Sequence, residues 1–150
     1  MVSDLADLYQ EVILDHNRRP RNFGDLPSPS RRAEGYNPLC GDRVTVSVVL
    51  EGDILKDVRF QGSGCAISKA SASMMTESLK GRTRTQAEEL FQAFHRLLTE
   101  DGASADPNVL GKLVVFSGVR EFPVRVKCAT LAWHTLRAAL ENVRDIATTE

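Results

Sequence analysis

Between residues 44 and 60 the sequence alternates apolar and polar side chains with a period of two, interrupted once by a turn signal. Such alternation is typical of a β-strand with one buried face, since successive side chains point to opposite sides of a sheet. The interruption, Glu51-Gly52-Asp53, is short enough to make the two halves an antiparallel hairpin. The alternating apolar residues are Val44, Val46, Val48 and Leu50 before the turn, and Val58 and Phe60 after it.

Helical periodicity, with apolar residues three and four positions apart, surrounds this hairpin. It predicts a helix over residues 4–16 capped by Ser3, a helix of small residues over 65–80 ended by Gly81, and a final helix over 124–145. The small side chains of the middle helix allow it to lie close against a sheet.

Shorter segments complete the predicted elements. Thr85-Gln86-Ala87-Glu88 has the spacing of a capping box and opens a further helix, residues 110–116 favour a short helix, and residues 33–36 a short strand. The order of helix, strands and helices predicts an α+β fold: a two-layer domain with helices packed on a small antiparallel sheet of about three strands. A chain of 150 residues is expected to form one domain.

Composition excludes several classes of function. The net charge of −1 offers no general attraction to nucleic acid or to an anionic membrane surface. No apolar run approaches the roughly 20 residues of a membrane span, and the N-terminus lacks the pattern of a signal peptide, so the cytoplasm is the expected location. Three cysteines without a secretory signal argue against a disulfide framework and leave packing groups, metal ligands or reactive thiols.

The three cysteines occupy distinctive places in the predicted elements. Cys40 and Asp42 flank Gly41 in the loop before the hairpin, where glycine lets both side chains turn toward one point. Cys65 follows Gly-Ser-Gly at a helix start, and Cys128 falls in the first turn of the last predicted helix. A helix N-terminus stabilises an anion, so we expect both of these thiols to have a lowered pKa.

Three thiolates and one carboxylate would supply the four ligands of a tetrahedral zinc site. Such a site carries a net charge near −2, which Arg43, Arg125 and Lys127 are placed in the sequence to balance. Spacing alone leaves the alternative of buried or incidental cysteines equally open, because no Cys-x-x-Cys pair is present.

Three cysteine motifs, in order along the chain, resemble those of the U-type iron–sulfur assembly proteins, the IscU and NifU N-terminal-like family. They are Asn37-Pro38-Leu39-Cys40-Gly41-Asp42, Gly62-Ser63-Gly64-Cys65-Ala66-Ile67-Ser68 and Lys127-Cys128-Ala129-Thr130-Leu131-Ala132. The opening, Leu8-Tyr9-Gln10-Glu11-Val12-Ile13-Leu14-Asp15-His16 with Pro20-Arg21-Asn22, is also similar to that family.

Two departures from the IscU type resemble its SufU-type branch. Lys127 replaces the histidine that precedes the last cysteine in IscU-type scaffolds, and a segment at about residues 83–108 is inserted. The resemblance implies Zn²⁺ bound by Cys40, Asp42, Cys65 and Cys128, with Arg125 and Lys127 offsetting charge or contacting a partner.

The SufU-type resemblance also implies a function. A SufS-type, pyridoxal-phosphate cysteine desulfurase would form a persulfide on its own cysteine. A ligand of that partner would replace Cys40 on zinc, and Cys40 would accept the terminal sulfur for delivery to a downstream SUF scaffold. The chain would thus be a zinc-dependent sulfurtransferase or sulfur carrier rather than a stand-alone enzyme.

Alternatives remain at this point. Thiolates also suit iron, so the same residues could assemble an iron–sulfur cluster transiently on a scaffold protein. A purely structural zinc site is a third reading. His16, His95 and His134 are not spaced as ligands, and His16 is interpreted as a surface or cap group. The arginines at 18, 19 and 21 are interpreted as solvated, with docking of an acidic partner as the alternative, and Trp133 as core.

Overall fold

A mixed sheet forms one side of the molecule in the computed structural model, which describes residues 2–100, 106–142 and 147–148. Its strands follow the order β3-β2-β1-β4. The first three are antiparallel, and β4 pairs in parallel with β1 through only two residues. The strands are β1 (Arg31–Asn37), β2 (Asp42–Glu51), β3 (Ile54–Ser63) and β4 (Ala147–Thr148).

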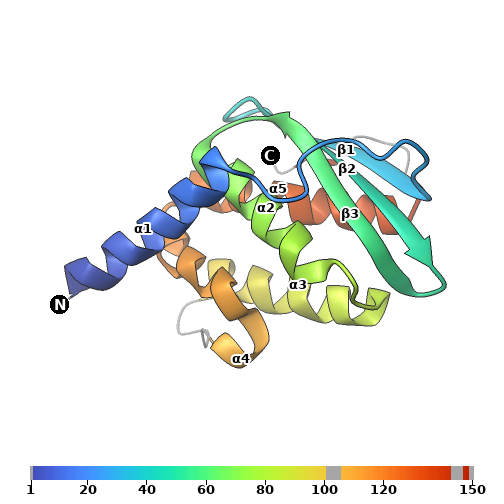
Figure 1. Ribbon diagram of the computed structural model, residues 1–150. Coiled ribbons are helices and arrows are strands. Elements are labelled where there is room, and N and C mark those ends of the chain that lie inside the picture. The colour runs from blue at the N-terminus through green and yellow to red at the C-terminus, as the bar shows by residue number, and fades with distance from the viewer. Residues whose placement is uncertain (1, 101–105, 143–146, 149–150) are drawn as a thin grey trace.

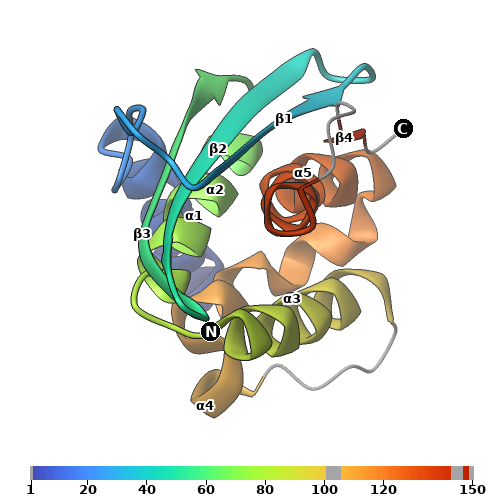
Figure 2. The same cartoon turned by 90° about the vertical axis from the view of Figure 1, so that its right-hand side faces the viewer.

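The helices cover one face of this sheet. α2 and α5 pack directly on the strands and on each other, and α1, α3 and η1 pack against α2 and α5 from outside (Figures 1 and 2). No helix in the described residues is long and apolar enough to cross a membrane. The helices are α1 (Val2–Arg18), α2 (Ala66–Leu79), α3 (Arg84–Thr99), α4 (Pro107–Leu110), the 3₁₀-helix η1 (Gly111–Glu121) and α5 (Pro123–Leu140).

The α+β fold and the three-stranded antiparallel sheet are confirmed. Val46 and Val48 are fully buried beneath the helices, as the period-two pattern predicts. Leu50 is only half-buried, because the register of β2 and β3 shifts between Val49 and Leu50. Such a bulge changes which face the following side chain points to.

Trp133, as predicted, belongs to the core and is 1% exposed. Its ring stacks on Phe94 of α3 with a centroid separation of 4.8 Å, and Phe94 meets Phe116 of η1 edge-on at 5.6 Å. Aromatic pairs at these separations add to the stabilisation that burial provides. These ring contacts join α3, η1 and α5 in the core.

Several predicted helix ends are wrong. The capping box of α3 is formed by Thr83 and Gln86, whose side chains each accept the other's backbone N–H at 3.1 and 3.0 Å. Thr85 lies inside the helix, where the extended backbone that a cap needs is lost. Ser3 likewise lies inside α1, which includes Val2.

Two other segments differ in extent or type from the prediction. Residues 110–116 are helical as predicted, but Leu110 ends α4 and residues 111–116 belong to the tighter 3₁₀-helix η1. The last helix ends at Leu140, earlier than predicted, and the rest of the predicted 124–145 range lies partly outside the described residues.

His16 is buried, so its interpretation as a surface or cap group was wrong. It is 2% exposed, and its Nδ1 lies 2.7 Å from Ser73 Oγ on α2. The backbone N–H of Arg21 donates to the same oxygen at 2.8 Å, and its guanidinium pairs with Asp15 at 2.7 Å. Arg21 thus helps to hold the end of α1 against α2.

Candidate metal centre

Cys40 lies in the tight connection between β1 and β2. The connection is closed by Gly41, whose N–H donates to the carbonyl of Asn37 at 2.8 Å and whose φ is +72°. A left-handed backbone of this kind favours glycine, so Gly41 has the unusual conformation that was expected of it between Cys40 and Asp42. Cys40 is half-buried.

Asp42 is the first residue of β2 and is fully buried. Its Oδ1 accepts the backbone N–H of Cys65 at 2.9 Å, which joins the β1–β2 connection to the start of α2. Gly64 lies directly against this carboxylate: a Cβ at that position would be 2.4 Å from Asp42 Oδ1. The absence of a side chain at 64 therefore makes room for Asp42.

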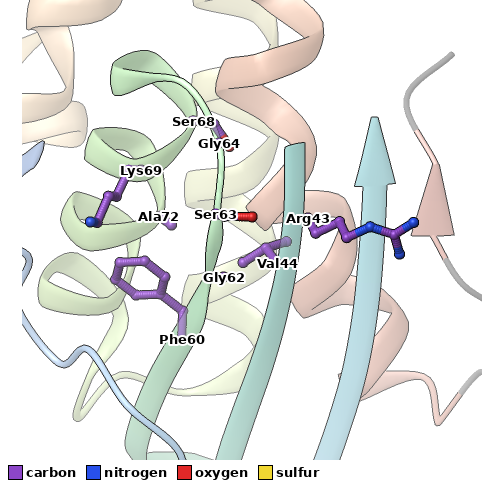
Figure 3. Close-up of a pocket in the computed structure, with 9 residues that line it drawn as sticks. All are labelled: Arg43, Val44, Phe60, Gly62, Ser63, Gly64, Ser68, Lys69 and Ala72. Carbon is purple, nitrogen blue, oxygen red and sulfur yellow. The ribbon is translucent and has the colours of Figure 1, made fainter. Parts of the chain in front are cut away.

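Cys65 is the N-cap residue of α2, as the sequence predicted. Its Sγ accepts the N–H of Ser68 at 3.4 Å and lies 3.9 Å from Asp42 Oδ2. Figure 3 shows the strand end at Gly62, Ser63 and Gly64 leading into α2, with the side chains of Arg43 and Lys69 directed to opposite sides. The sulfur of Cys65 thus sits at the positive end of a 14-residue helix.

Cys128 does not lie in the first turn of the last helix. α5 begins at Pro123, so Cys128 is the sixth residue and lies beyond the free N–H groups of the helix end. Burial raises the pKa of the Cys128 thiol far above its ordinary value, and hydrogen bonds with Cys40 and Asp42 raise it further. The expected lowering of this pKa was therefore wrong.

The three segments bring thiol and carboxylate groups together. Cys128 Sγ lies 3.2 Å from Cys40 Sγ, and ligand atoms of Cys40, Asp42 and Cys128 all lie within 4.8 Å of one another. This group does not include Cys65, which contacts it through Asp42. Two sulfurs and a carboxylate oxygen this close fit a zinc or iron ion.

The basic residues named from the sequence are close by but not paired with Asp42. Arg43 lies over the ring of Tyr36, with its guanidinium carbon 4.4 Å from the centroid. Arg125 is exposed and Lys127 half-buried. Among the residues that the structure describes, no ion pair joins any of the three to Asp42, so none balances its charge by direct contact.

An apolar groove of about 630 Å³ opens beside the start of α2. Its lining includes Ala66 and Ile67, which follow Cys65, and Phe122 and Arg125 of the η1–α5 corner. Neither this groove nor the buried position of Asn37 beside Cys128 was predicted from the sequence. The groove combines residues from four elements, and Asn37 stood out only as the first letter of a cysteine motif.

Comparisons with known proteins agree with the cysteine motifs. The family profile described as the NifU-like N terminal domain matches residues 8–129. A Bacillus subtilis protein, the zinc-dependent sulfurtransferase SufU, is 42% identical over 89% of this chain and 90% of its own. The iron–sulfur cluster assembly scaffold protein IscU of Streptococcus pyogenes is 36% identical over 94% of this chain and 87% of its own.

A solved structure shows the same fold. It is a putative iron–sulfur cluster assembly scaffold protein for the SUF system from Fervidobacterium islandicum, with a TM-score of 0.81 and 38% identity over 87% of this chain and 94% of that one. The matched profile spans all three cysteines and most of the described fold. With its motifs, its sheet and its helices in agreement, the chain belongs to the NifU-like N-terminal domain family.

Proposed function

We propose that this protein acts in iron–sulfur cluster biogenesis as a zinc-dependent sulfur acceptor. It takes persulfide sulfur from a SufS-type cysteine desulfurase in the cytoplasm and passes it to a downstream SUF scaffold. The observation that carries the proposal is the asymmetry of the site: Cys40 is a half-buried loop residue whose sulfur lies 3.2 Å from that of the fully buried Cys128. The similarity to the Bacillus SufU supports it.

The zinc ligands in this proposal are Cys40, Asp42, Cys65 and Cys128. Three of them are already clustered, and Cys65 Sγ is 3.9 Å from Asp42 Oδ2, so the four residues would supply the ligand number of a tetrahedral site. Bound zinc would keep these thiols deprotonated at neutral pH. That effect matters most for Cys128, whose pKa burial raises.

Cys40 is the acceptor because it is the ligand that can move. It lies in a connection between strands, whereas Cys65 caps α2 and Cys128 lies within α5. The Cys40 thiolate attacks the terminal sulfur of the desulfurase persulfide, forming a new S–S bond. The S–S bond of the donor breaks, and its cysteine leaves as the thiolate, so no external oxidant or reductant is needed.

The desulfurase docks on the apolar surface around Cys40. Leu39, next to Cys40 in the chain, and Phe122, which lines the groove with Ile67 and Arg125, are each 58% exposed. Apolar side chains this exposed near a reactive group are typical of a protein contact. Arg125, with Lys127 nearby, supplies positive charge for an acidic group of the partner.

The test is sulfur transfer to Cys40→Ala protein. Wild-type protein should stimulate turnover of the desulfurase and gain one sulfur atom on Cys40, detected by mass spectrometry after thiol alkylation. Cys40→Ala should do neither, while Val109→Ala, a change at an exposed α4 residue, should behave as wild type. Undiminished stimulation by Cys40→Ala would remove the acceptor role.

A scaffold for iron–sulfur cluster assembly is the second candidate function. The Streptococcus relative bears that name, and thiolates bind iron as readily as zinc. Elemental analysis and a visible spectrum of aerobically purified protein separate the two functions. Colourless protein with zinc supports sulfur transfer, and brown protein with iron and sulfide supports the scaffold.

A further inference from the structure

Asn37 is the last residue of β1 and pairs across the sheet with Asp42. It is fully buried, where an amide without hydrogen-bond partners is costly. Its Nδ2 donates to Cys128 Sγ at 3.6 Å, and its Oδ1 accepts the N–H of Leu39 at 3.2 Å. Its main-chain carbonyl accepts the N–H of Gly41 at 2.8 Å. One residue thus contacts both the loop that carries Cys40 and the helix that carries Cys128.

The hydrogen bonds fix which way the amide points. The N–H of Leu39 can only donate, so the group facing it must be the oxygen of Asn37. The NH₂ group is consequently directed at the sulfur of Cys128. Among the described residues, this is the only side-chain N–H that is hydrogen bonded to one of the three cysteine sulfurs.

We propose that Asn37 is the positioning residue of the metal centre. Its amide N–H holds the Cys128 sulfur and stabilises negative charge there, and its carbonyl oxygen holds the Cys40 loop against that sulfur. Arg43, Arg125 and Lys127, which were expected to balance the charge of the site, form no ion pair with Asp42 among the described residues, and the neutral N–H of Asn37 is the side-chain donor at the buried sulfur. Groups that hydrogen bond to metal ligands set both the geometry and the affinity of a site.

This inference rests on the proposed metal site but is separable from sulfur transfer. A residue that only closed the turn would need its oxygen and not its N–H. Asn37→Ser distinguishes the two roles, since a serine hydroxyl can accept the N–H two residues on but is too short to reach Cys128. Asn37→Ala removes both contacts.

The experiment titrates wild type, Asn37→Ser and Asn37→Ala with Zn²⁺ against a chelator, and records the thiolate-to-metal charge-transfer band of the Co²⁺ forms. Both variants should lose about tenfold to a hundredfold in zinc affinity. Their cobalt band should move to lower energy, because a thiolate without its hydrogen bond gives up charge more readily. Asn108→Ser, the same change at an exposed residue of α4, should match wild type.

Asn37→Ser with wild-type affinity and an unshifted band would overturn the proposal and leave sulfur transfer standing. Wild-type protein that binds neither metal would overturn both. Circular dichroism and denaturant unfolding of the metal-free variants check that each is folded. If Asn37→Ala fails that check, the shift in Asn37→Ser alone decides.

Discussion

Replacing Gly64 by alanine should disturb the metal centre without adding a charge or removing a ligand. The new Cβ would lie 2.4 Å from Oδ1 and 3.1 Å from Cβ of Asp42, whereas ordinary contacts begin at 3.4 Å. The carboxylate would have to move by about 1 Å, the difference between 3.4 and 2.4 Å. Asp42 is short, fully buried and fixed to β2, so it cannot swing aside as an exposed side chain could.

The size of the effect follows from the hydrogen bond that this movement breaks. The N–H of Cys65 donates to Asp42 Oδ1 at 2.9 Å, and a hydrogen bond to a charged group contributes about 1.5–3 kcal/mol. We expect Gly64→Ala to destabilise the metal-free protein by about that amount. Since 1.4 kcal/mol is tenfold in a binding constant, a similar loss at the metal would weaken zinc binding by about tenfold to a hundredfold.

Urea unfolding of the metal-free protein and chelator competition for zinc measure the two effects. Gly118→Ala is the matched control, because a Cβ there would meet nothing within 4 Å. It should leave zinc affinity unchanged and slightly raise stability, as glycine-to-alanine changes at unstrained sites do. Equal stability and equal zinc affinity for Gly64→Ala and wild type would refute the packing argument.

Two further predictions concern the core. Burial and then the charge of Arg21 lower the pKa of His16 below its ordinary 6.5, so the unfolded chain takes up the proton first as the pH falls. The contribution of His16 to the free energy of unfolding should therefore be fully present above pH 6.5 and decline below it. His16→Gln should flatten that decline in urea unfolding measured from pH 7.5 to 5. An unchanged dependence of the unfolding free energy on pH would contradict the assignment. Separately, the indole N–H of Trp133 donates to Ser71 Oγ at 3.1 Å. Ser71→Ala should cost about 1–3 kcal/mol by leaving a buried donor unpaired, and less in a Trp133→Phe background, whereas equal costs in both backgrounds would rule the hydrogen bond out.

The hairpin and the buried helical faces could be predicted because each is encoded within a few neighbouring residues. Val46, Val48 and Trp133 are buried as their periodicity required. The start of α3 was misplaced because Thr83 and Thr85 begin two overlapping N-cap patterns. Only the backbone conformation of Thr83 selects between them. β4 was missed because two residues in parallel pairing have no local pattern.

The sequence predicted which side chains come close together better than it predicted the pKa of Cys128. The motifs named Cys40, Asp42 and Cys128, which the structure brings together, and Cys65, which lies beside them. The pKa of Cys128 was predicted in the wrong direction because Cys128 lies beyond the free N–H groups at the start of α5, and burial raises its pKa. Burial by residues from other elements cannot be seen in a local pattern.

Cys40 is half-buried and Cys128 fully buried, so the two sides of the centre differ in their access to solvent. A reagent dissolved in water meets Cys40 first, and the core behind Cys128 closes the opposite approach. The burial that limits access to Cys128 also raises the pKa of its thiol, so both effects disfavour reaction there. In the proposed transfer, a bulky donor would approach Cys40 over the β1–β2 connection, while Cys128 stays buried in α5.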